Sequence, residues 1–414
     1  MTSRPPELNA HALIEHLDAL AAISGPGAGV TRLAYSEAWC RAHQWLAARA
    51  HDLGLTATPD SAGNLLFHSP GQRLRDPSRP VLLVGSHLDT VLNGGRYDGA
   101  YGVVAGLLLA AQPREPGSLA VVGFATCEEE ESRFHGGLMG ARSLLGLVEA
   151  DELDRVHDAE GVTWRAALDA ARARGCASPL AAGARPFEPL FRAATMLELH
   201  IEQGPVLESD GLELGIVEHI AGYRRLALTI RGEARHSGTT PMNHRRDALA
   251  AAAEMILATE LEARAAGEPA VATAGFVRPR PGLANVVPGA CELWLEARHT
   301  DAAPPPGDSA RGVTLEIEDR SSMEPTALST ELVATAERLA RESGIPHRRM
   351  ASGAAHDAMV FARAGIPALM LFVPSRAGIS HAPEEHTDPD ALAVGCRFAA
   401  ALIDRVAREG VPQP

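Results

Sequence analysis

Two uninterrupted apolar segments constrain the fold of this chain most strongly. They are PVLLVGS (80–86) and SLAVVGFAT (118–126), and the segment YGVVAGLLLAA (101–111) lies between them. Apolar runs of this length are typical of strands that are buried on both faces, as in a parallel sheet. Two parallel strands need a long crossover, and the middle segment can supply it as a helix. The pattern therefore predicts a βαβ unit in an α/β domain.

The pattern changes near residue 220 and returns near residue 325. Three segments in between alternate apolar and polar side chains, which is typical of antiparallel strands with one solvent-exposed face. These segments are 225–232, 290–298 and 312–319. An alanine-rich segment, 245–267, is expected to form a long helix. We therefore predict a discontinuous catalytic α/β domain, 1–218 plus 325–414, into which a smaller α+β domain, 219–324, is inserted.

The composition argues against several classes of partner. The net charge is −14 over 414 residues, which disfavours nucleic acid or an anionic membrane as the main partner. No uninterrupted apolar segment reaches the about 18 residues of a transmembrane helix, and the first residues lack the apolar centre of a signal peptide. The five cysteines are widely spaced, without a CxxC pair, so we interpret them as reduced core thiols. We expect a cytoplasmic protein.

Metal-binding residue types follow three of the predicted strands. His87 and Asp89 follow the first apolar strand, four glutamates (128–131) follow the second, and SHAPEEHT (380–387) follows a third apolar run, 366–373. Each piece alone is more often a solvated loop. Four adjacent carboxylates beyond a buried strand repel each other unless cations or raised pKa values relieve them. Imidazole and carboxylate ligands without thiolate suit zinc, manganese, cobalt or nickel.

Seven motifs resemble, in the same order, those of the hydantoinase/carbamoylase branch of the M20 metallopeptidase-like amidohydrolases. They are GSHLDTVLNGGRYDG (85–99), EEEESRF (128–134), LELHIEQGPVLE (197–208), HSGTTPMNHRRDAL (236–249), NVVPG (285–289), GAAHDA (353–358) and PSRAGISHAPEEHT (374–387). The resemblance extends from about residue 30 to residue 405. It implies a di-metal aminopeptidase-like catalytic domain with an inserted lid domain that mediates formation of a homodimer.

The resemblance also implies two divalent metal ions in each subunit. Their expected ligands are His87, Asp98, Glu130, His200 and His381. Asp98 would bridge both ions. Asp89 would bind neither ion but would fix the orientation and tautomer of His87. Glu129 would act as the general base that takes a proton from water and delivers it to the leaving nitrogen. His236 resembles a lid histidine that stabilises the developing oxyanion, and it is expected to reach the site of the partner subunit.

Besides His236, four residues are candidates for binding the substrate. In relatives, residues like Asn285 and Arg298 bind the substrate carboxylate, a task that suits the planar guanidinium group. Gln203 resembles an amide that contacts the substrate. His356, in the glycine-containing segment SGAAHDA, is the weaker candidate. A surface charge at Arg298 is the alternative interpretation.

The sequence departs from the family pattern at two places. Glu131 stands where relatives commonly have a small residue, so the working pair is Glu129/Glu130, or else Glu128/Glu129 or Glu130/Glu131. In the small domain, relatives have a second helix where this chain has HTDAAPPPGDSARG (299–312). Three consecutive prolines cannot lie inside a helix. We therefore predict that the lid lacks its second helix.

The motifs favour a hydrolase that acts on non-peptide C–N bonds in linear amides or amidines. We expect it to cleave the ureido group of a small carboxylate-bearing substrate, an N-carbamoyl-L-amino acid or allantoate, with release of ammonia and carbon dioxide. Paired arginines, Arg224 and Arg225, are more similar to the allantoate-acting members. The alternatives are an M20-type peptidase or deacylase that acts on a dipeptide or N-acyl amino acid, and a scaffold protein without metal.

Overall fold

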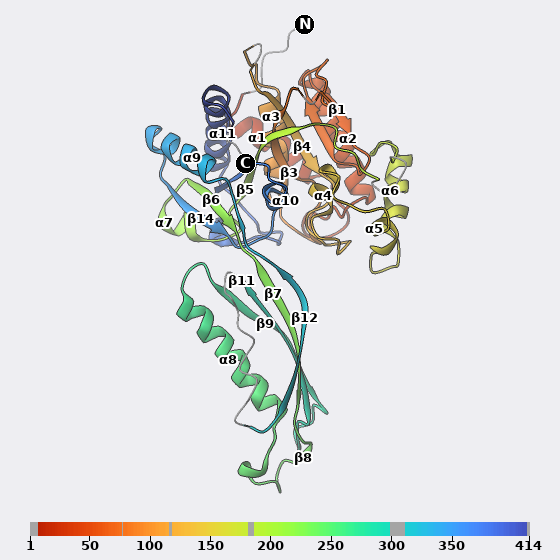
Figure 1. Ribbon diagram of the computed structural model, residues 1–414, viewed down its shortest axis with the longest axis vertical. Coiled ribbons are helices and arrows are strands. Elements are labelled where there is room, and N and C mark those ends of the chain that lie inside the picture. The colour runs from red at the N-terminus through yellow and green to blue at the C-terminus, as the bar shows by residue number, and fades with distance from the viewer. Residues whose placement is uncertain (1–6, 77, 116–117, 181–185, 299–310, 412–414) are drawn as a thin grey trace. The chain divides into compact units, whose positions relative to one another are not determined.

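A computed structural model describes residues 7–76, 78–115, 118–180, 186–298 and 311–411 (Figure 1). Contacts between residues divide the chain into two compact units. The first unit comprises residues 1–218, 327–350 and 356–414, and the second comprises 219–326 and 351–355. The chain of the second unit is thus inserted into the chain of the first. Within the described residues, no helix is long and apolar enough to span a membrane.

A nine-stranded sheet forms the centre of the first unit. In spatial order its strands are β1 (Thr56–Pro59), β2 (Leu65–His68), β4 (Ala120–Thr126), β3 (Val81–His87), β5 (Ala193–Ile201), β15 (Ala368–Val373), β6 (Leu214–Ile220) and β13 (Thr326–Ala327), and β14 (His347–Ser352) pairs with β6. The four central strands, β4, β3, β5 and β15, are parallel. Every residue of β3 and of β15 is buried, which explains their uninterrupted apolar sequences.

Helices cover this sheet in two groups (Figure 1). One group contains α1 (Ala10–Ala21), α3 (Ala100–Ala110), α9 (Thr330–Glu342) and α11 (Pro389–Glu409), and the other contains α4 (Met139–Leu144) and α10 (Asp357–Arg363). The remaining helices are α2 (Glu37–Asp52), which contacts β1 and β2, and α5 (Glu152–Arg155), α6 (Trp164–Ala173) and α7 (Val206–Asp210). Every residue of α3 is buried. Gly102 lets α3 approach the sheet, because a Cβ atom there would lie 2.4 Å from the carbonyl oxygen of Leu199.

The second unit contains a four-stranded antiparallel sheet and the helix α8 (Ala248–Ala266) beside it (Figure 1). The strands, in spatial order, are β12 (Thr314–Met323), β7 (Tyr223–Arg231), β11 (Ala290–Arg298) and β9 (Val271–Arg280). Alternate residues, such as Leu226 and Leu228 on β7 and Leu293 on β11, form its core with Met255 of α8. The short strands β8 (Arg235–His236) and β10 (Val286–Val287) pair with each other and form a separate antiparallel ribbon.

The predicted α/β fold is confirmed, including the βαβ unit formed by β3, α3 and β4. The alternating segments form the antiparallel strands β7, β11 and β12. The segment 299–310, on which most of the prediction of a missing lid helix depends, lies outside the described residues. In the described part of the second unit, α8 is the α-helix. The missing second helix therefore stays a prediction.

Candidate metal centre

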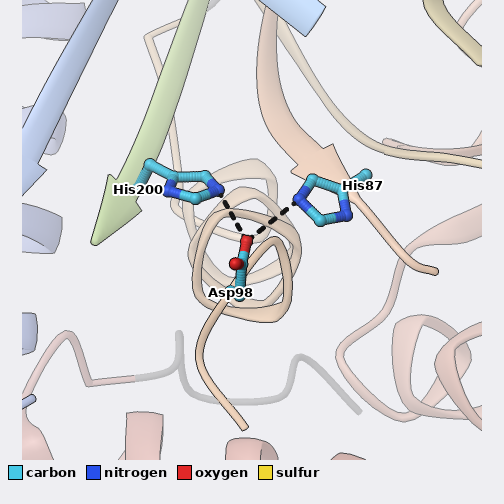
Figure 2. Close-up of side chains that lie close together, drawn as sticks. All are labelled: His87, Asp98 and His200. Atoms are coloured by element: carbon cyan, nitrogen blue, oxygen red, sulfur yellow. Dashed lines mark ion pairs between the residues drawn. The ribbon is translucent and has the colours of Figure 1, made fainter. Parts of the chain in front are cut away.

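One carboxylate and two imidazoles from distant parts of the chain meet at the carboxyl ends of β3 and β5 (Figure 2). His87 is the last residue of β3, His200 lies near the end of β5, and Asp98 precedes α3. Asp98 Oδ1 lies 3.3 Å from His87 Nε2 and 3.2 Å from His200 Nε2. All three side chains are buried. We call His87, Asp98 and His200 the first triad.

Backbone carbonyl groups orient both imidazoles of the first triad. His87 Nδ1 lies 3.1 Å from the carbonyl oxygen of Asp89, and His200 Nδ1 lies 2.8 Å from that of Ile201. A carbonyl oxygen only accepts, so Nδ1 carries the proton and Nε2 of a neutral imidazole turns its lone pair toward Asp98. The backbone N–H of Gly99 donates to His200 Nε2 at 3.3 Å, which agrees with this tautomer.

A second triad consists of Asp98, Glu130 and His381. His381 Nε2 lies 3.3 Å from Asp98 Oδ2 and 3.4 Å from Glu130 Oε2. The two triads therefore use different oxygens of the same carboxylate, Asp98. Glu130 Oε1 is buried and has no hydrogen-bond partner among the described residues. In each triad the potential ligand atoms lie within 4.8 Å of one another.

The acidic segment after β4 directs its four carboxylates to different places. The carboxylate of Asp89 accepts hydrogen bonds from the backbone N–H groups of Glu129 (3.0 Å) and Glu130 (3.2 Å). The side chain of Glu128 turns away and accepts from the N–H of Met139, and that of Glu131 accepts from the N–H of Gly137. The geometry thus favours the pair Glu129/Glu130 over the two neighbouring registers.

Glu129 lies beside the triads and is not a member of either. Its Oε2 is 3.9 Å from His87 Nε2, and its Oε1 is 3.6 Å from His356 Nδ1. Burial raises the pKa of Glu129 well above its usual value. The charge of His87 opposes this rise, and the negative charge of Glu130 adds to it. A buried carboxylate with a raised pKa holds a proton more readily than an ordinary carboxylate, which suits it to accept a proton and pass it on.

The electrostatics of the triads fit bound cations. Burial and the charge of Asp98 raise the pKa of Glu130 to about 8. Hydrogen bonding to Asp98 raises the pKa of His381 to about 9. Without a cation, the site therefore holds protons near neutral pH to balance its excess of carboxylates. A donor set of imidazole nitrogens and carboxylate oxygens, with an orphaned oxygen on Glu130, is one that divalent cations such as zinc or manganese accept.

Two residues that sequence reasoning missed support Asp98. Glu385 is buried, and its Oε1 accepts from the backbone N–H groups of Tyr97 (2.8 Å) and Asp98 (3.1 Å). The hydroxyl of Ser380 lies 3.1 Å from Asp98 Oδ2 and 2.9 Å from Glu385 Oε2. Both residues belong to SHAPEEHT, which the sequence had already indicated. The sequence alone could identify Glu385 as an acid near the site, but it could not identify the backbone N–H groups that donate to it.

Two further missed carboxylates lie beneath the site. Glu198 on β5 is fully buried and accepts from the Ser86 hydroxyl (2.8 Å) and the Ala358 N–H (2.9 Å). Asp357, at the start of α10, accepts from the hydroxyl of Thr126 at 2.5 Å. Glu198 and His200 are two residues apart on a strand, so both side chains lie on the same face of the sheet. This spacing of two residues was the signal in the sequence that could have identified Glu198.

Gln203 and His356 both contact the triads. Gln203 Nε2 donates to Asp98 Oδ2 at 2.7 Å. His356 is buried against His200, with ring centroids 4.6 Å apart. Neither ring nitrogen of His356 has a hydrogen-bond partner among the described residues. Both side chains are therefore positioned at the edge of the site, where the sequence predicted contacts with substrate.

The other three candidates lie in the second unit, and they form two separate groups. His236 on β8 pairs with Val286, and the N–H of Ser237 donates to the carbonyl oxygen of Asn285 at 3.1 Å. Arg298 is the last residue of β11 and donates to Glu296 Oε1 (2.8 Å) and to the carbonyl oxygen of Gly353 (2.6 Å). A nine-residue strand separates the two groups, roughly 27 Å along the sheet. One chain therefore does not bring Asn285 and Arg298 together.

The chain is similar to a known family of hydrolases. The model of Peptidase family M20/M25/M40 matches residues 83–405. An allantoate amidohydrolase of Escherichia coli (strain K12) is 37% identical over 403 residues, which cover 92% of this chain and 94% of that protein. An N-carbamoyl-L-amino-acid amidohydrolase of Paenarthrobacter aurescens is 36% identical over 404 residues, which cover 94% of this chain and 96% of that protein.

Solved structures agree with the sequence comparisons. The crystal structure of a hydantoinase/carbamoylase family amidase from Burkholderia ambifaria matches with a TM-score of 0.82 and 32% identity. The match covers 99% of each chain. The family predicted from the seven motifs is confirmed. The chain belongs to Peptidase family M20/M25/M40 and, within it, to the hydantoinase/carbamoylase branch of amidohydrolases.

Proposed function

We propose that the protein is a metal-dependent amidohydrolase that cleaves the ureido C–N bond of a small carboxylate-bearing substrate. The substrate is an N-carbamoyl-L-amino acid or allantoate, and the products include ammonia and carbon dioxide. The observation that carries the proposal is the pair of triads that share Asp98, with the protonatable Glu129 beside them. The names of the two relatives at 37% and 36% identity support both substrates equally.

Two divalent cations fit the two triads. His87 and His200 would hold one ion, Glu130 and His381 the other, and the two oxygens of Asp98 would serve both. Such a pair of ions, when bound, lowers the pKa of water and polarises a carbonyl group. Asp89 and Glu385 fix the backbone of the ligand-bearing segments through hydrogen bonds to N–H groups, so the ligand geometry is preorganised.

Glu129 would carry the proton during the reaction. A ureido nitrogen leaves poorly unless it is protonated, so hydrolysis requires a group that accepts a proton from water and delivers it to nitrogen. Glu129 is buried beside the first triad, and its raised pKa favours the uptake of a proton from water. Gln203, which donates to Asp98, would turn its amide toward a bound substrate.

Recognition of the substrate carboxylate would require two copies of the chain. Arg298 would bind the carboxylate with its guanidinium group, and Asn285 and His236 lie at the other end of β11. Because Arg298 lies far from His236 and Asn285 within one chain, a second copy would supply His236 and Asn285 to the site that Arg298 serves. We therefore propose a homodimer formed through the second unit, in which His236 stabilises the developing oxyanion.

A substrate panel tests the proposed reaction. The purified protein, stripped of metal, is supplied in turn with manganese, cobalt, nickel and zinc. Each preparation is then assayed for ammonia from N-carbamoyl-L-amino acids and from allantoate. We expect ammonia from one of these substrates with at least one metal and none without metal. Cleavage of dipeptides or N-acyl amino acids without ammonia release would indicate the peptidase or deacylase instead, and absence of metal binding would indicate a scaffold.

A further inference from the structure

Two of the five cysteines lie next to each other in the first unit. Cys40 is on α2, and Cys176 follows the end of α6. Cys176 Sγ lies 3.8 Å from the carbonyl oxygen of Cys40. The guanidinium group of Arg174 lies 3.9 Å from Cys40 Sγ, measured from Nη1. A further bond, from Gln44 of α2 to the carbonyl oxygen of Arg174 at 3.0 Å, joins the same two segments.

The other three cysteines have different surroundings. Cys127 follows β4 and accepts a hydrogen bond from the hydroxyl of Tyr35 at 3.2 Å. Cys291 lies on β11 in the second unit, and Cys396 lies on α11. All five thiols are free and buried. Cys40 and Cys176 are thus the thiols that share contacts with one arginine-bearing turn.

The turn that contacts this thiol pair through Arg174 is exposed. Residues 173–175, which comprise the last residue of α6 and the two residues before Cys176, are all exposed. Gly175 adopts a φ of +78°, and a Cβ atom there would meet nothing within 4 Å. The chain that directly precedes the buried Cys176 is therefore open to solvent. A nearby guanidinium group stabilises a thiolate, which is the reactive form of cysteine.

We propose that Cys40 and Cys176 form an oxidation site, at which a hydroperoxide converts the two thiols into an intramolecular disulfide. In the first step, Cys40 sulfur attacks one oxygen of the peroxide. The O–O bond breaks, and a sulfenic acid and an alcohol (or water) are formed. In the second step, Cys176 sulfur attacks Cys40 sulfur, and the S–O bond breaks with loss of water, which takes the thiol proton. The thiols lose two electrons, and the peroxide gains them.

The titration of the pair agrees with this order of steps. A hydrogen bond from the Cys176 thiol, helped by Arg174 and opposed by burial, lowers the pKa of Cys40 to about 6. The same hydrogen bond and burial raise the pKa of Cys176. Cys40 is therefore the thiolate that attacks the peroxide, and Cys176 is the thiol that resolves the sulfenic acid.

The cross-link would act on a segment that supports the acidic loop. The N–H of Ser178 donates to the carbonyl oxygen of Asp60 at 2.8 Å. The carboxylate of Asp60 accepts from Asn64 Nδ2 at 2.7 Å, and Asn64 Oδ1 accepts from the N–H of Cys127 at 2.8 Å. Cys127 directly precedes the four glutamates. A disulfide also closes a long loop of the unfolded chain, so we expect the melting temperature to rise by several degrees.

Oxidation of the full-length protein tests the proposal. The reduced protein is treated with hydrogen peroxide, the remaining thiols are alkylated under denaturing conditions, and the protein is digested without reductant for mass spectrometry. We expect two of the five thiols to become resistant to alkylation, and a peptide pair linked between Cys40 and Cys176 that reductant separates. Loss of no thiols, or linkage through Cys127, Cys291 or Cys396, would overturn the proposal.

Single substitutions separate the roles of the two cysteines. In Cys176→Ser, Cys40 should accumulate as a sulfenic acid that dimedone traps, and in Cys40→Ser the linked peptide should disappear. Cys396→Ser, which removes another buried thiol, is the matched control and should retain the linked peptide. Arg174→Met should slow the loss of thiols several-fold, and Arg174→Lys should restore most of the rate. Equal oxidation of Cys40 and Cys176 in each other's absence would contradict the assigned order.

Discussion

The carboxylate of Asp89 accepts a hydrogen bond from the backbone N–H of Glu129 at 3.0 Å, while its carbonyl oxygen orients His87 through Nδ1 at 3.1 Å. One buried residue therefore positions a candidate ligand on β3 and the acidic segment after β4. The contact joins the ends of two neighbouring parallel strands. It gives the site a fixed geometry before any ligand binds.

Replacing the Asp89 carboxylate should disturb both segments at once, because Asp89 Oδ1 also lies 3.4 Å from His87 Nδ1. The backbone carbonyl of residue 89 remains in the variant. We expect Asp89→Ala to lower metal affinity or kcat/KM by about 10- to 100-fold, because residues that orient metal ligands have effects of this size. Metal titration and steady-state kinetics measure the effect. Asp404→Ala, which removes an exposed acid on α11, serves as the control and should behave like the wild type. An unchanged metal affinity and activity in Asp89→Ala would show that the hydrogen bonds are dispensable.

Glu129 and Glu131 should differ sharply although they are two residues apart. Glu129→Gln should lower kcat by about 10²- to 10⁴-fold with little change in metal content, because the amide cannot accept the proton. Glu131→Gln should retain nearly full activity, since the Glu131 side chain accepts from Gly137 rather than facing the triads. Kinetics and elemental analysis of both variants check this. A larger loss in Glu131→Gln would indicate that the register is wrong by one or more residues.

The metal-free protein should become less stable as the pH rises. Burial and the charge of Asp98 raise the pKa of Glu130 to about 8, and burial and the charge of Glu198 raise the pKa of Asp357 to about 8. Between their ordinary values near pH 4 and about pH 8, the folded protein thus binds more protons than the unfolded chain. Its free energy of unfolding therefore falls as pH rises through this window.

Thermal unfolding in the presence of a chelator measures this dependence. The melting temperature should be lower at about pH 8 than at about pH 6, and Asp357→Asn should weaken the dependence. Added divalent metal should stabilise most at the higher pH, where protons no longer compete for the ligands. A melting temperature of the metal-free protein that rises over the same interval would contradict the raised carboxyl pKa values.

Two inactive variants should complement each other if His236 acts in a second copy of the chain. His236→Ala removes the proposed oxyanion donor, and Glu129→Gln removes the proposed base. A mixed dimer would contain one site with both groups intact, so random mixing should restore about a quarter of wild-type activity. Co-expression with two affinity tags, followed by kinetics, makes the measurement. Purified mixed dimers without activity would exclude a site shared in this way.

Three of the strands that the sequence predicted have burial that is uniform or strictly alternating. β3 and β15 are buried at every position, and β11 alternates along its whole length. The central strand β5 was not recognised, because Glu198 and His200 interrupt its apolar sequence. Those two polar residues are buried at the candidate site, so they obscured the apolar pattern of the strand.

The candidate ligands could be named from the sequence because they follow strand ends and lie in family motifs, but the residues that support them could not. The partners of Glu198, and the backbone N–H groups that donate to Glu385, lie more than 100 residues away in the chain, and a single sequence gives no sign of such contacts. The separation of Asn285 from Arg298 follows from the length of β11. The order of motifs along the chain does not show how far apart Asn285 and Arg298 lie in space. The pairing of the strands shows it.

Counting the bound metal tests most directly whether Asp98 serves two cations. Protein reconstituted with zinc or manganese and dialysed free of excess metal would be analysed by elemental mass spectrometry, together with His381→Ala and Asp98→Ala. The account predicts about two ions per wild-type chain, about one in His381→Ala and fewer than one in Asp98→Ala. A wild-type chain that holds one ion or none, or an Asp98→Ala chain that still holds two, would contradict it.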